Sequence, residues 1–118
     1  MIASRAMALD LEAIASYTLG RKKLDPSQVS GELAALGTRW SIAGSDLRMD
    51  LPVKPMAKAA AVVGAAAAIA DDLDHHPTIT VEYKGVTLAI HTHDAGGLTM
   101  TDFVYAARLE RWLRAQGY

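Results

Sequence analysis

Residues 71–93, DDLDHHPTITVEYKGVTLAIHTH, decide the fold and contain all four histidines of this 118-residue chain. The acidic residues at the start of this stretch end an alanine-rich segment, and Pro77 favours an extended backbone at the residue before it. Apolar and polar residues then alternate on both sides of Lys84-Gly85, a tight-turn signal. The stretch therefore predicts a helix end followed by an antiparallel hairpin, with His91 and His93 opposite the apolar face of its second strand.

The flanking segments repeat this combination of a helix and a hairpin. Residues 25–37 begin with Asp-Pro-Ser, which favours a helix start, and end with a glycine that favours a stop. Residues 39–51 alternate around a Gly-Ser turn and predict a first hairpin. Residues 55–73 begin with proline and are rich in alanine, and residues 99–113 have one apolar side, so both segments predict helices.

These elements predict an α+β fold in the order α-β-β-α-β-β-α. A four-stranded antiparallel sheet with three helices packed on one face satisfies that order. The length allows one compact domain, which we place at residues 24–118. Residues 1–23 form an N-terminal extension, in which residues 9–19 favour a helical turn or two.

Composition excludes several classes of protein. The formal net charge is −1 and the basic residues are dispersed apart from residues 21–23, so direct binding of nucleic acid is not expected. The absence of cysteine excludes disulfides and thiolate metal sites. Asp10 and Glu12 interrupt the first apolar stretch, and the apolar run 59–70 is shorter than the roughly 18 residues of a membrane span. We expect a cytoplasmic protein without a membrane partner.

The histidines are the residues best suited to chemistry. Imidazole exchanges protons near neutral pH, so a cluster of histidines suits general acid and base catalysis. His75 follows three aspartates at the end of a predicted helix, where the carboxylates and the helix dipole favour a charged ring. We therefore expect His75 to hold its proton near pH 7. Pro77 fixes how the rings of His75 and His76 diverge, so that one can react while the other orients a substrate.

Several separated motifs together resemble one family. They are residues 71–77, Tyr83, Thr92-His93, residues 97–99 and Asp102, with Trp40 in the first predicted strand. At these spacings the motifs are similar to the signature of the pterin-4a-carbinolamine dehydratases. The resemblance extends over about residues 24–113, and a joint match at separate positions is more specific than a histidine pair alone.

The resemblance implies dehydration of 4a-hydroxytetrahydrobiopterin to quinonoid dihydropterin, as in tetrahydrobiopterin recycling. It implies no metal and no organic cofactor. The catalytic residues would be His75 and His93, as the proton-transfer pair, and His76, which orients the pterin. Asp102 and Asp74 would support them. The expected substrate-binding residues come from both histidine segments: His75, His76, Pro77, Thr92, His93, Asp94 and Ala95.

Two of these motifs have other interpretations. Thr99 to Asp102 is a capping-box pattern, so the Asp102 carboxylate is expected either to cap a helix or to support the site, and the two roles are compatible. His91 and His93 on alternate strand positions also resemble half of a zinc site, which His75 and His76 would complete. Loss of a metal ion on replacement of His91 would distinguish that site from a dehydratase.

The resemblance also bears on partners. Members of the family associate, so we expect a homodimer or homotetramer. Ala60, Gly64 and Ala68 recur every four residues and either admit a helix of another subunit or pack on the chain's own sheet. The alternative function is a non-catalytic binding module, acting as a dimerisation cofactor or assembly factor for another protein. Retention of every histidine of the motif argues for catalysis.

Overall fold

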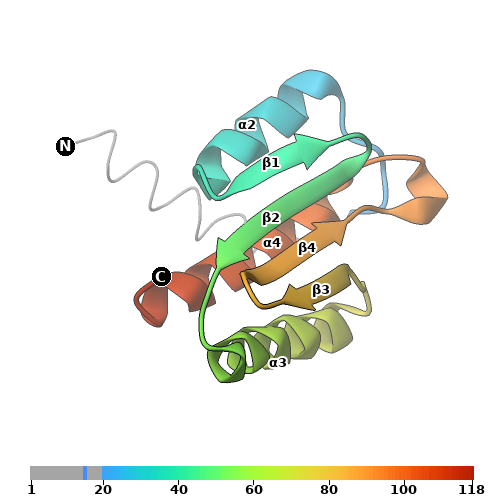
Figure 1. Cartoon of the computed structure of the whole chain (residues 1–118). Helices are drawn as coiled ribbons and strands as arrows, with labels where there is room; N and C mark the ends of the chain where they lie inside the picture. Colours follow the sequence, from blue (N-terminus) through green and yellow to red (C-terminus); the bar gives the residue numbers. More distant parts are fainter. Residues whose placement is uncertain (1–14, 16–19) are drawn as a thin grey trace.

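The structure, a computed structural model, describes Ala15 and residues 20–118 (Figure 1). The helical turns predicted over residues 9–19 therefore lie outside the described residues, except for Ala15. The described elements are α2 (Pro26–Leu36), β1 (Trp40–Ala43), β2 (Asp46–Pro52), α3 (Met56–Leu73), β3 (Thr78–Glu82), β4 (Gly85–Ile90), the short 3-10 helix η1 (His93–Ala95) and α4 (Met100–Ala115). This order confirms the predicted α+β class.

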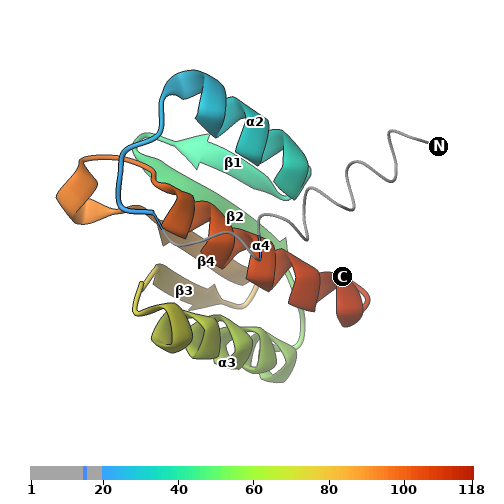
Figure 2. The same ribbon diagram turned by 180° about the vertical axis from the view of Figure 1, so that it is seen from behind.

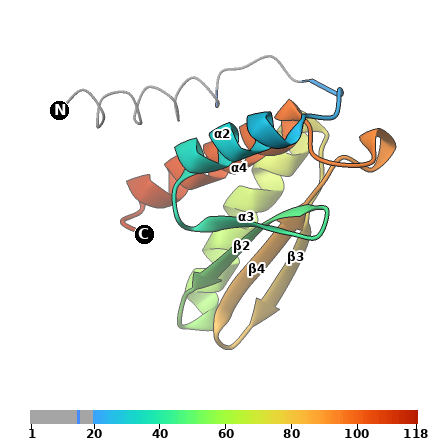
Figure 3. The ribbon, with the colours of Figure 1, turned by 90° about the horizontal axis from the view of Figure 1, so that it is seen from above.

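The strands form one antiparallel sheet in the order β1-β2-β4-β3. Helices α2, α3 and α4 lie on the same face of this sheet, with α4 between the other two (Figures 2 and 3). The predicted packing of three helices on one face is thereby confirmed. None of the helices in the described part of the chain is long and apolar enough to cross a membrane.

The core lies between the two central strands and α4. The strand register pairs apolar residues that face the helices: Leu47 with Ile90, Met49 with Leu88 and Leu51 with Val86. All six are buried. Each such side chain stabilises the fold by about 1.5–3 kcal/mol relative to exposure to water. Alternation in the sequence is therefore sufficient to specify which face of the sheet is covered.

The face of the sheet opposite the helices carries hydrogen-bonded polar groups. Asp50 Oδ1 accepts hydrogen bonds from Thr87 Oγ1 at 2.9 Å and from Arg48 Nη2 at 3.1 Å. The hydrogen bond from Arg48 lowers the pKa of Asp50 below its ordinary value. The centre of this face thus presents polar side chains to solvent.

The second hairpin differs from the sequence prediction at the start and at the end of β4. Its turn is Tyr83-Lys84, and Gly85 is already the first residue of β4. A Cβ atom at Gly85 would lie 2.1 Å from the Leu51 carbonyl oxygen, so glycine is required there by the close approach of β2. At its other end β4 stops at Ile90, and the histidines predicted on the strand lie in the segment after it.

Helix α4 is buried on more sides than its apolar stripe predicts. Every residue from Thr101 to Ala107 is buried. Part of the cover comes from residues that precede the predicted domain: Thr101 Oγ1 donates to the Gly20 carbonyl at 2.9 Å, and Arg108 Nε donates to the Ala15 carbonyl at 3.3 Å. A pattern within α4 does not reveal cover supplied by such a distant segment.

A buried carboxylate joins α4 to the first strand. Glu110 Oε1 accepts hydrogen bonds from Arg39 Nε and Trp40 Nε1, both at 2.9 Å, and Oε2 accepts one from Arg114 Nε at 2.8 Å. Burial alone would raise the pKa of Glu110, but the hydrogen bonds from Arg39, Arg114 and Trp40 outweigh it and hold that pKa below its ordinary value. The charged form is therefore the one that stabilises the fold.

Replacing Glu110 with glutamine should lower the free energy of unfolding at pH 7 by about 2 kcal/mol, because hydrogen bonds to the charged carboxylate are lost. Since the folded-state pKa is lowered, this contribution is complete above the ordinary value of about 4.3 and is lost as pH falls through the folded-state pKa. Urea unfolding of both proteins between pH 7 and pH 3 measures it, with Glu82→Gln on the exposed β3 as control. An undiminished difference at pH 3 would contradict this interpretation.

Candidate active site

All four histidines of the chain meet at one pocket of about 190 Å³. It lies where the end of α3 approaches the segment that follows β4. Its lining residues are Arg21, His75, His76, His91, Thr92, His93 and Asp94. The four histidines therefore form a cluster in the structure, and segments 75–76 and 91–94 form most of the pocket wall.

The end of α3 turns His75 toward the interior. Asp74 caps the helix in the left-handed conformation, at φ 49°, and its backbone N–H donates to the carbonyls of Ala70 and Asp71. The His75 N–H then donates to the Ala70 carbonyl at 3.0 Å. This turn leaves the His75 side chain only 8% exposed. Asp74 thus shapes the site through its backbone, and a role for its carboxylate stays a prediction.

His75 is held by a fully buried carboxylate from α4. Its Nε2 lies 2.6 Å from Asp102 Oδ1. Asp102 Oδ2 accepts hydrogen bonds from Thr92 Oγ1 at 2.7 Å and from the Thr99 N–H at 2.9 Å. An ionised carboxylate only accepts, so the hydrogen on His75 is at Nε2 and Nδ1 is the nitrogen left for a ligand. Asp102 therefore both caps α4 and orients His75.

Thr92 belongs to this network rather than offering a free hydroxyl to a substrate. It is 2% exposed, and its single hydroxyl hydrogen is directed to Asp102. The Thr99 hydroxyl, 2.7 Å from Thr92 Oγ1, must therefore be the donor in that pair. Sequence reasoning placed Thr92 in the pocket but missed this link. The signal in the sequence is the position of Thr92 between His91 and His93, because alternate residues of an extended segment point to opposite sides.

The other three histidines differ in their side-chain contacts. His76 Nε2 lies 3.1 Å from Asp71 Oδ1, and His91 Nδ1 lies 2.8 Å from Asp46 Oδ1. The His93 side chain makes no hydrogen bond or ion pair with any residue that the structure describes. Its ring centroid lies 6.0 Å from that of His91. His93 is therefore the exposed imidazole with both nitrogens available.

The acidic residues are distributed differently from the sequence expectation. We expected Asp71, Asp72 and Asp74 to influence His75, but its carboxylate partner is Asp102. Asp71 contacts His76, and Asp72 Oδ2 lies 3.0 Å from Nη1 of Arg108 in α4. The left-handed turn causes this difference, because it directs the His75 ring away from the helix that precedes it.

The remaining predicted residues lie around the same pocket. Asp94 lines it, whereas Pro77 and Ala95 adjoin lining residues in the chain without lining the pocket themselves. Among the described residues, no group of three or more His, Cys, Asp or Glu side chains is arranged to hold a metal ion. Sequence reasoning missed Asp46 as the partner of His91, and it missed Arg21 altogether.

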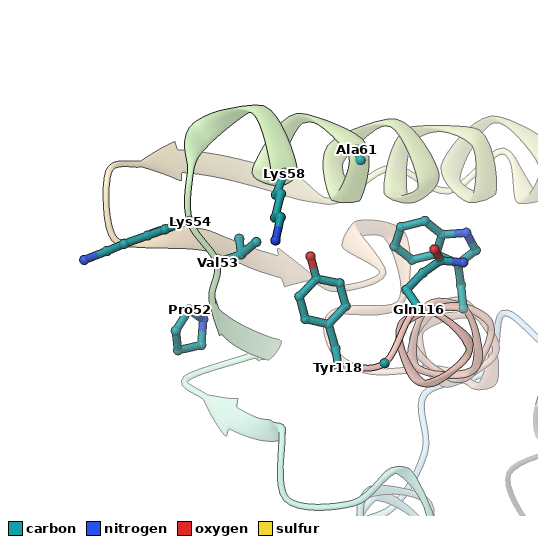
Figure 4. Close-up of a pocket in the computed structure, with 9 residues that line it drawn as sticks. Pro52, Val53, Lys54, Lys58, Ala61, Gln116 and Tyr118 are labelled. Carbon is teal, nitrogen blue, oxygen red and sulfur yellow. The ribbon is translucent and has the colours of Figure 1, made fainter.

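A larger pocket of about 530 Å³ lies at the other end of α3 (Figure 4). It is lined by residues that include Lys58 near the start of α3 and Trp112, Gln116 and Tyr118 at the end of the chain. Lysine and aromatic side chains supply no neutral-pH proton relay comparable to paired imidazoles. The histidine pocket is therefore the candidate active site despite its smaller size.

Comparisons with known proteins point to one family. The sequence model of the family described as Pterin 4 alpha carbinolamine dehydratase matches residues 22–112. Two curated relatives carry the name "Putative pterin-4-alpha-carbinolamine dehydratase". The protein from Chromobacterium violaceum is 41% identical over 75 residues, covering 64% of this chain and 69% of that protein. The protein from Roseiflexus castenholzii is 36% identical over 87 residues, covering 74% and 92%.

A solved structure is also similar. It is titled as a transcriptional coactivator/pterin dehydratase from Brucella melitensis, and it superposes with a TM-score of 0.71 at 26% sequence identity. The match covers 76% of this chain and 97% of that one. The region matched by the family includes all four histidines and Asp102, and it begins one residue after Arg21.

Proposed function

The chain belongs to the pterin 4 alpha carbinolamine dehydratase family, and we propose that it is a hydro-lyase that converts 4a-hydroxytetrahydrobiopterin to quinonoid dihydropterin. The family resemblance found in the sequence is thereby confirmed. The reaction and its place in tetrahydrobiopterin recycling are our proposal. The observation that carries it is the pocket lined by both His75 and His93. The ring of His75 is oriented by Asp102, and the ring of His93 has no hydrogen-bond partner among the described residues.

The reaction requires one acid and one base at neighbouring atoms. The C4a–O bond breaks and the hydroxyl leaves as water after it gains a proton. The N5–H proton is removed, and its electron pair forms the C4a=N5 double bond. No electrons are exchanged with an outside group, so two proton-transfer residues suffice for this step.

The contacts of the two histidines suggest how these tasks are divided. Asp102 fixes the hydrogen of His75 at Nε2 and stabilises the positive ring that forms when Nδ1 accepts a proton. His75 is therefore the base for N5, a task that requires a neutral ring in place of the charged ring expected from the sequence, and His93 is the acid for the leaving hydroxyl. His76 orients the pterin, with Pro77 behind it. Residues 92–94, which line the pocket, border the pterin ring, and Ala95 follows them in the chain.

The dehydration of chemically generated 4a-hydroxytetrahydrobiopterin, followed by absorbance, tests this function. Wild-type protein should accelerate it. A chelator should have no effect, and His91→Ala should retain most of the rate, because His91 has no assigned proton-transfer task. If the histidines instead hold zinc, the chelator and the His91 variant will both abolish the reaction and the protein-bound metal.

We also propose that the chain forms a homodimer or homotetramer. Ala60, Gly64 and Ala68 are exposed, so the interpretation in which they pack on the chain's own sheet is wrong. The edge strand β3, which contacts α3, pairs with β4 on one side and with no described strand on the other, and Val81 near its end is 40% exposed. Small residues let a second helix approach closely. A helix face and a free strand edge thus lie together on one side of the molecule.

Gly64→Glu should dissociate this oligomer, because it places a charge where two helices would approach. Gly31→Glu on α2 is the matched control, since both glycines are exposed in helices with nothing within 4 Å of an added Cβ. Sedimentation velocity at micromolar concentration measures the outcome. A wild type that sediments only as a 12.6 kDa species would refute the oligomer.

A further inference from the structure

The end of α4 builds one wall of the larger pocket, which has a volume of about 530 Å³. The Gly117 N–H donates to the Arg114 carbonyl at 3.1 Å, and the Tyr118 N–H donates to the Leu113 carbonyl at 3.0 Å. These two bonds, with Gly117 at φ 90°, form the Schellman motif that commonly ends a helix. The motif reverses the chain, so that the Tyr118 side chain lies at the pocket opposite the start of α3 (Figure 4).

Four polar side chains that line this pocket have no partner among the described residues. They are the Lys58 ammonium, the Tyr118 hydroxyl, the Gln116 amide and the Trp112 indole N–H. The Lys58 ammonium and the Tyr118 hydroxyl point toward the same space between α3 and the end of the chain (Figure 4). All four groups can donate hydrogen bonds, so the lining offers several donors to a bound molecule.

The side chains of the lining carry positive charge only. Lys54 and Lys58 are among the lining residues, and no acidic side chain is. Lys54 Nζ lies 4.5 Å from the centre of the Tyr83 ring and points away from the pocket (Figure 4). Lys58, which makes no ion pair with a described carboxylate, is in the first turn of α3, where the helix dipole adds positive charge and no acidic residue offsets it. The pocket therefore favours an anion with a single negative charge.

The rings in the lining favour an aromatic ligand. Trp112 and Tyr118 provide two aromatic surfaces, and Val53 and Ala61 add apolar ones. Aromatic rings pair well in stacked or edge-to-face arrangements. The volume of the pocket lies within the roughly 300–1,000 Å³ that is typical of small-molecule sites. Because the lining contains no histidine and no carboxylate side chain, the pocket is suited to binding a molecule rather than to transferring its protons.

We propose that this pocket is a second small-molecule site, which binds an aromatic monocarboxylate. The carboxylate lies between Lys58 and Tyr118, and the aromatic ring packs on Trp112. The proposal is independent of the dehydration reaction, because none of the four histidines lines this pocket. It also excludes amino acids as good ligands, since the lining has no acidic side chain to accept their ammonium group.

Dissociation constants measured by calorimetry test the class of ligand. The probe is phenylpropanoate, and three molecules are compared with it: its neutral amide, propanoate without the ring, and phenylalanine with an added ammonium. Phenylpropanoate should bind roughly tenfold more tightly than each of the three, because charge-assisted hydrogen bonds are the strong ones and the ring adds packing. Equal affinity for any of the three, or no binding of phenylpropanoate at millimolar concentration, would overturn the proposal.

Two variants assign the bound probe to one of the two pockets. Lys58→Ala should weaken the binding of phenylpropanoate roughly tenfold, because it removes the charge that faces the carboxylate. Arg21→Ala removes an equal charge from the histidine pocket and should leave the affinity unchanged. Both side chains are exposed without a described partner, so neither variant should unfold the protein. The reverse pattern would place the probe in the histidine pocket and overturn the proposal.

The indole N–H signals of the chain give a second readout by nuclear magnetic resonance. The chain has two tryptophans. The Trp40 indole donates to Glu110 in the core, whereas the Trp112 indole lines the pocket. Phenylpropanoate should shift the Trp112 signal and leave the Trp40 signal in place, and Trp112→Phe identifies which signal is which. Binding that leaves the Trp112 signal unshifted would contradict the proposed site.

Discussion

Replacing His93 with alanine is expected to lower kcat for dehydration by roughly 10²–10⁴-fold, the usual contribution of a positioned acid or base. His93 is the exposed histidine without a partner among the described residues, so its ring is free to donate a proton to the leaving hydroxyl. Because the side chain is exposed and makes no described hydrogen bond, the free energy of unfolding should change little. Initial rates at saturating pterin measure the effect.

His91→Ala is the matched control for this variant. The two rings lie 6.0 Å apart and both are exposed, but His91 is paired with Asp46. We expect a loss of only a few-fold for His91→Ala. Equal losses in the two variants would show that the pocket needs imidazoles in general and would contradict the specific role of His93.

Replacing Asp102 with asparagine is expected to lower kcat by roughly 10²-fold or more while KM changes little. The amide oxygen can still accept from the Thr99 N–H, but the amide nitrogen cannot accept the hydrogen of His75 Nε2. The hydrogen of the His75 ring is then no longer fixed at Nε2. The negative charge of Asp102, which stabilises the protonated ring, is also lost. The pH dependence of kcat should shift as well, which a purely structural residue would not cause.

Asp72→Asn is the control for this second variant, because Asp72 pairs with Arg108 outside the pocket lining and should matter little to the rate. Asp102→Ala should in addition destabilise the fold by about 3 kcal/mol, since it leaves buried donors of Thr92, Thr99 and His75 unpaired. If Asp102→Asn lowers only the melting temperature and leaves kcat and its pH profile unchanged, Asp102 is a helix cap alone.

Local sequence signals predicted most of the fold. Asp25 caps α2 by accepting from the Gln28 N–H at 2.9 Å, and Pro26 is the first residue of that helix, as the Asp-Pro-Ser start indicates. The apolar alternation of β2 and β4 corresponds to the buried pairs between them. These signals succeed because capping and strand alternation depend on neighbours in the chain.

The details of the site depend on contacts that no local pattern carries. The partner of His75 is 27 positions away, and the left-handed Asp74 selects it over three closer aspartates. Asp46, which pairs with His91, comes from the start of β2. Pairings of this kind follow from how the hairpins and helix ends meet, so the sequence predicts the histidine cluster but not its acidic partners.

Arg21 shows the same limit at the boundary of the predicted domain. From the sequence, the basic triplet at residues 21–23 belongs to the end of the N-terminal extension. In the structure, Gly20 and Leu24 on either side of it bond to α4 and to the segment before α4. The functional surface therefore includes residues that composition alone would assign outside the domain.

The most direct test of the central claim is the rate constant for dehydration of 4a-hydroxytetrahydrobiopterin with folded wild-type protein in excess. We predict that this rate constant rises with protein concentration to a plateau. A His75→Ala/His93→Ala double variant that still binds a dihydropterin should return it to the value without protein. A folded wild type that binds the dihydropterin yet leaves the rate constant unchanged would contradict catalysis and favour the non-catalytic binding module.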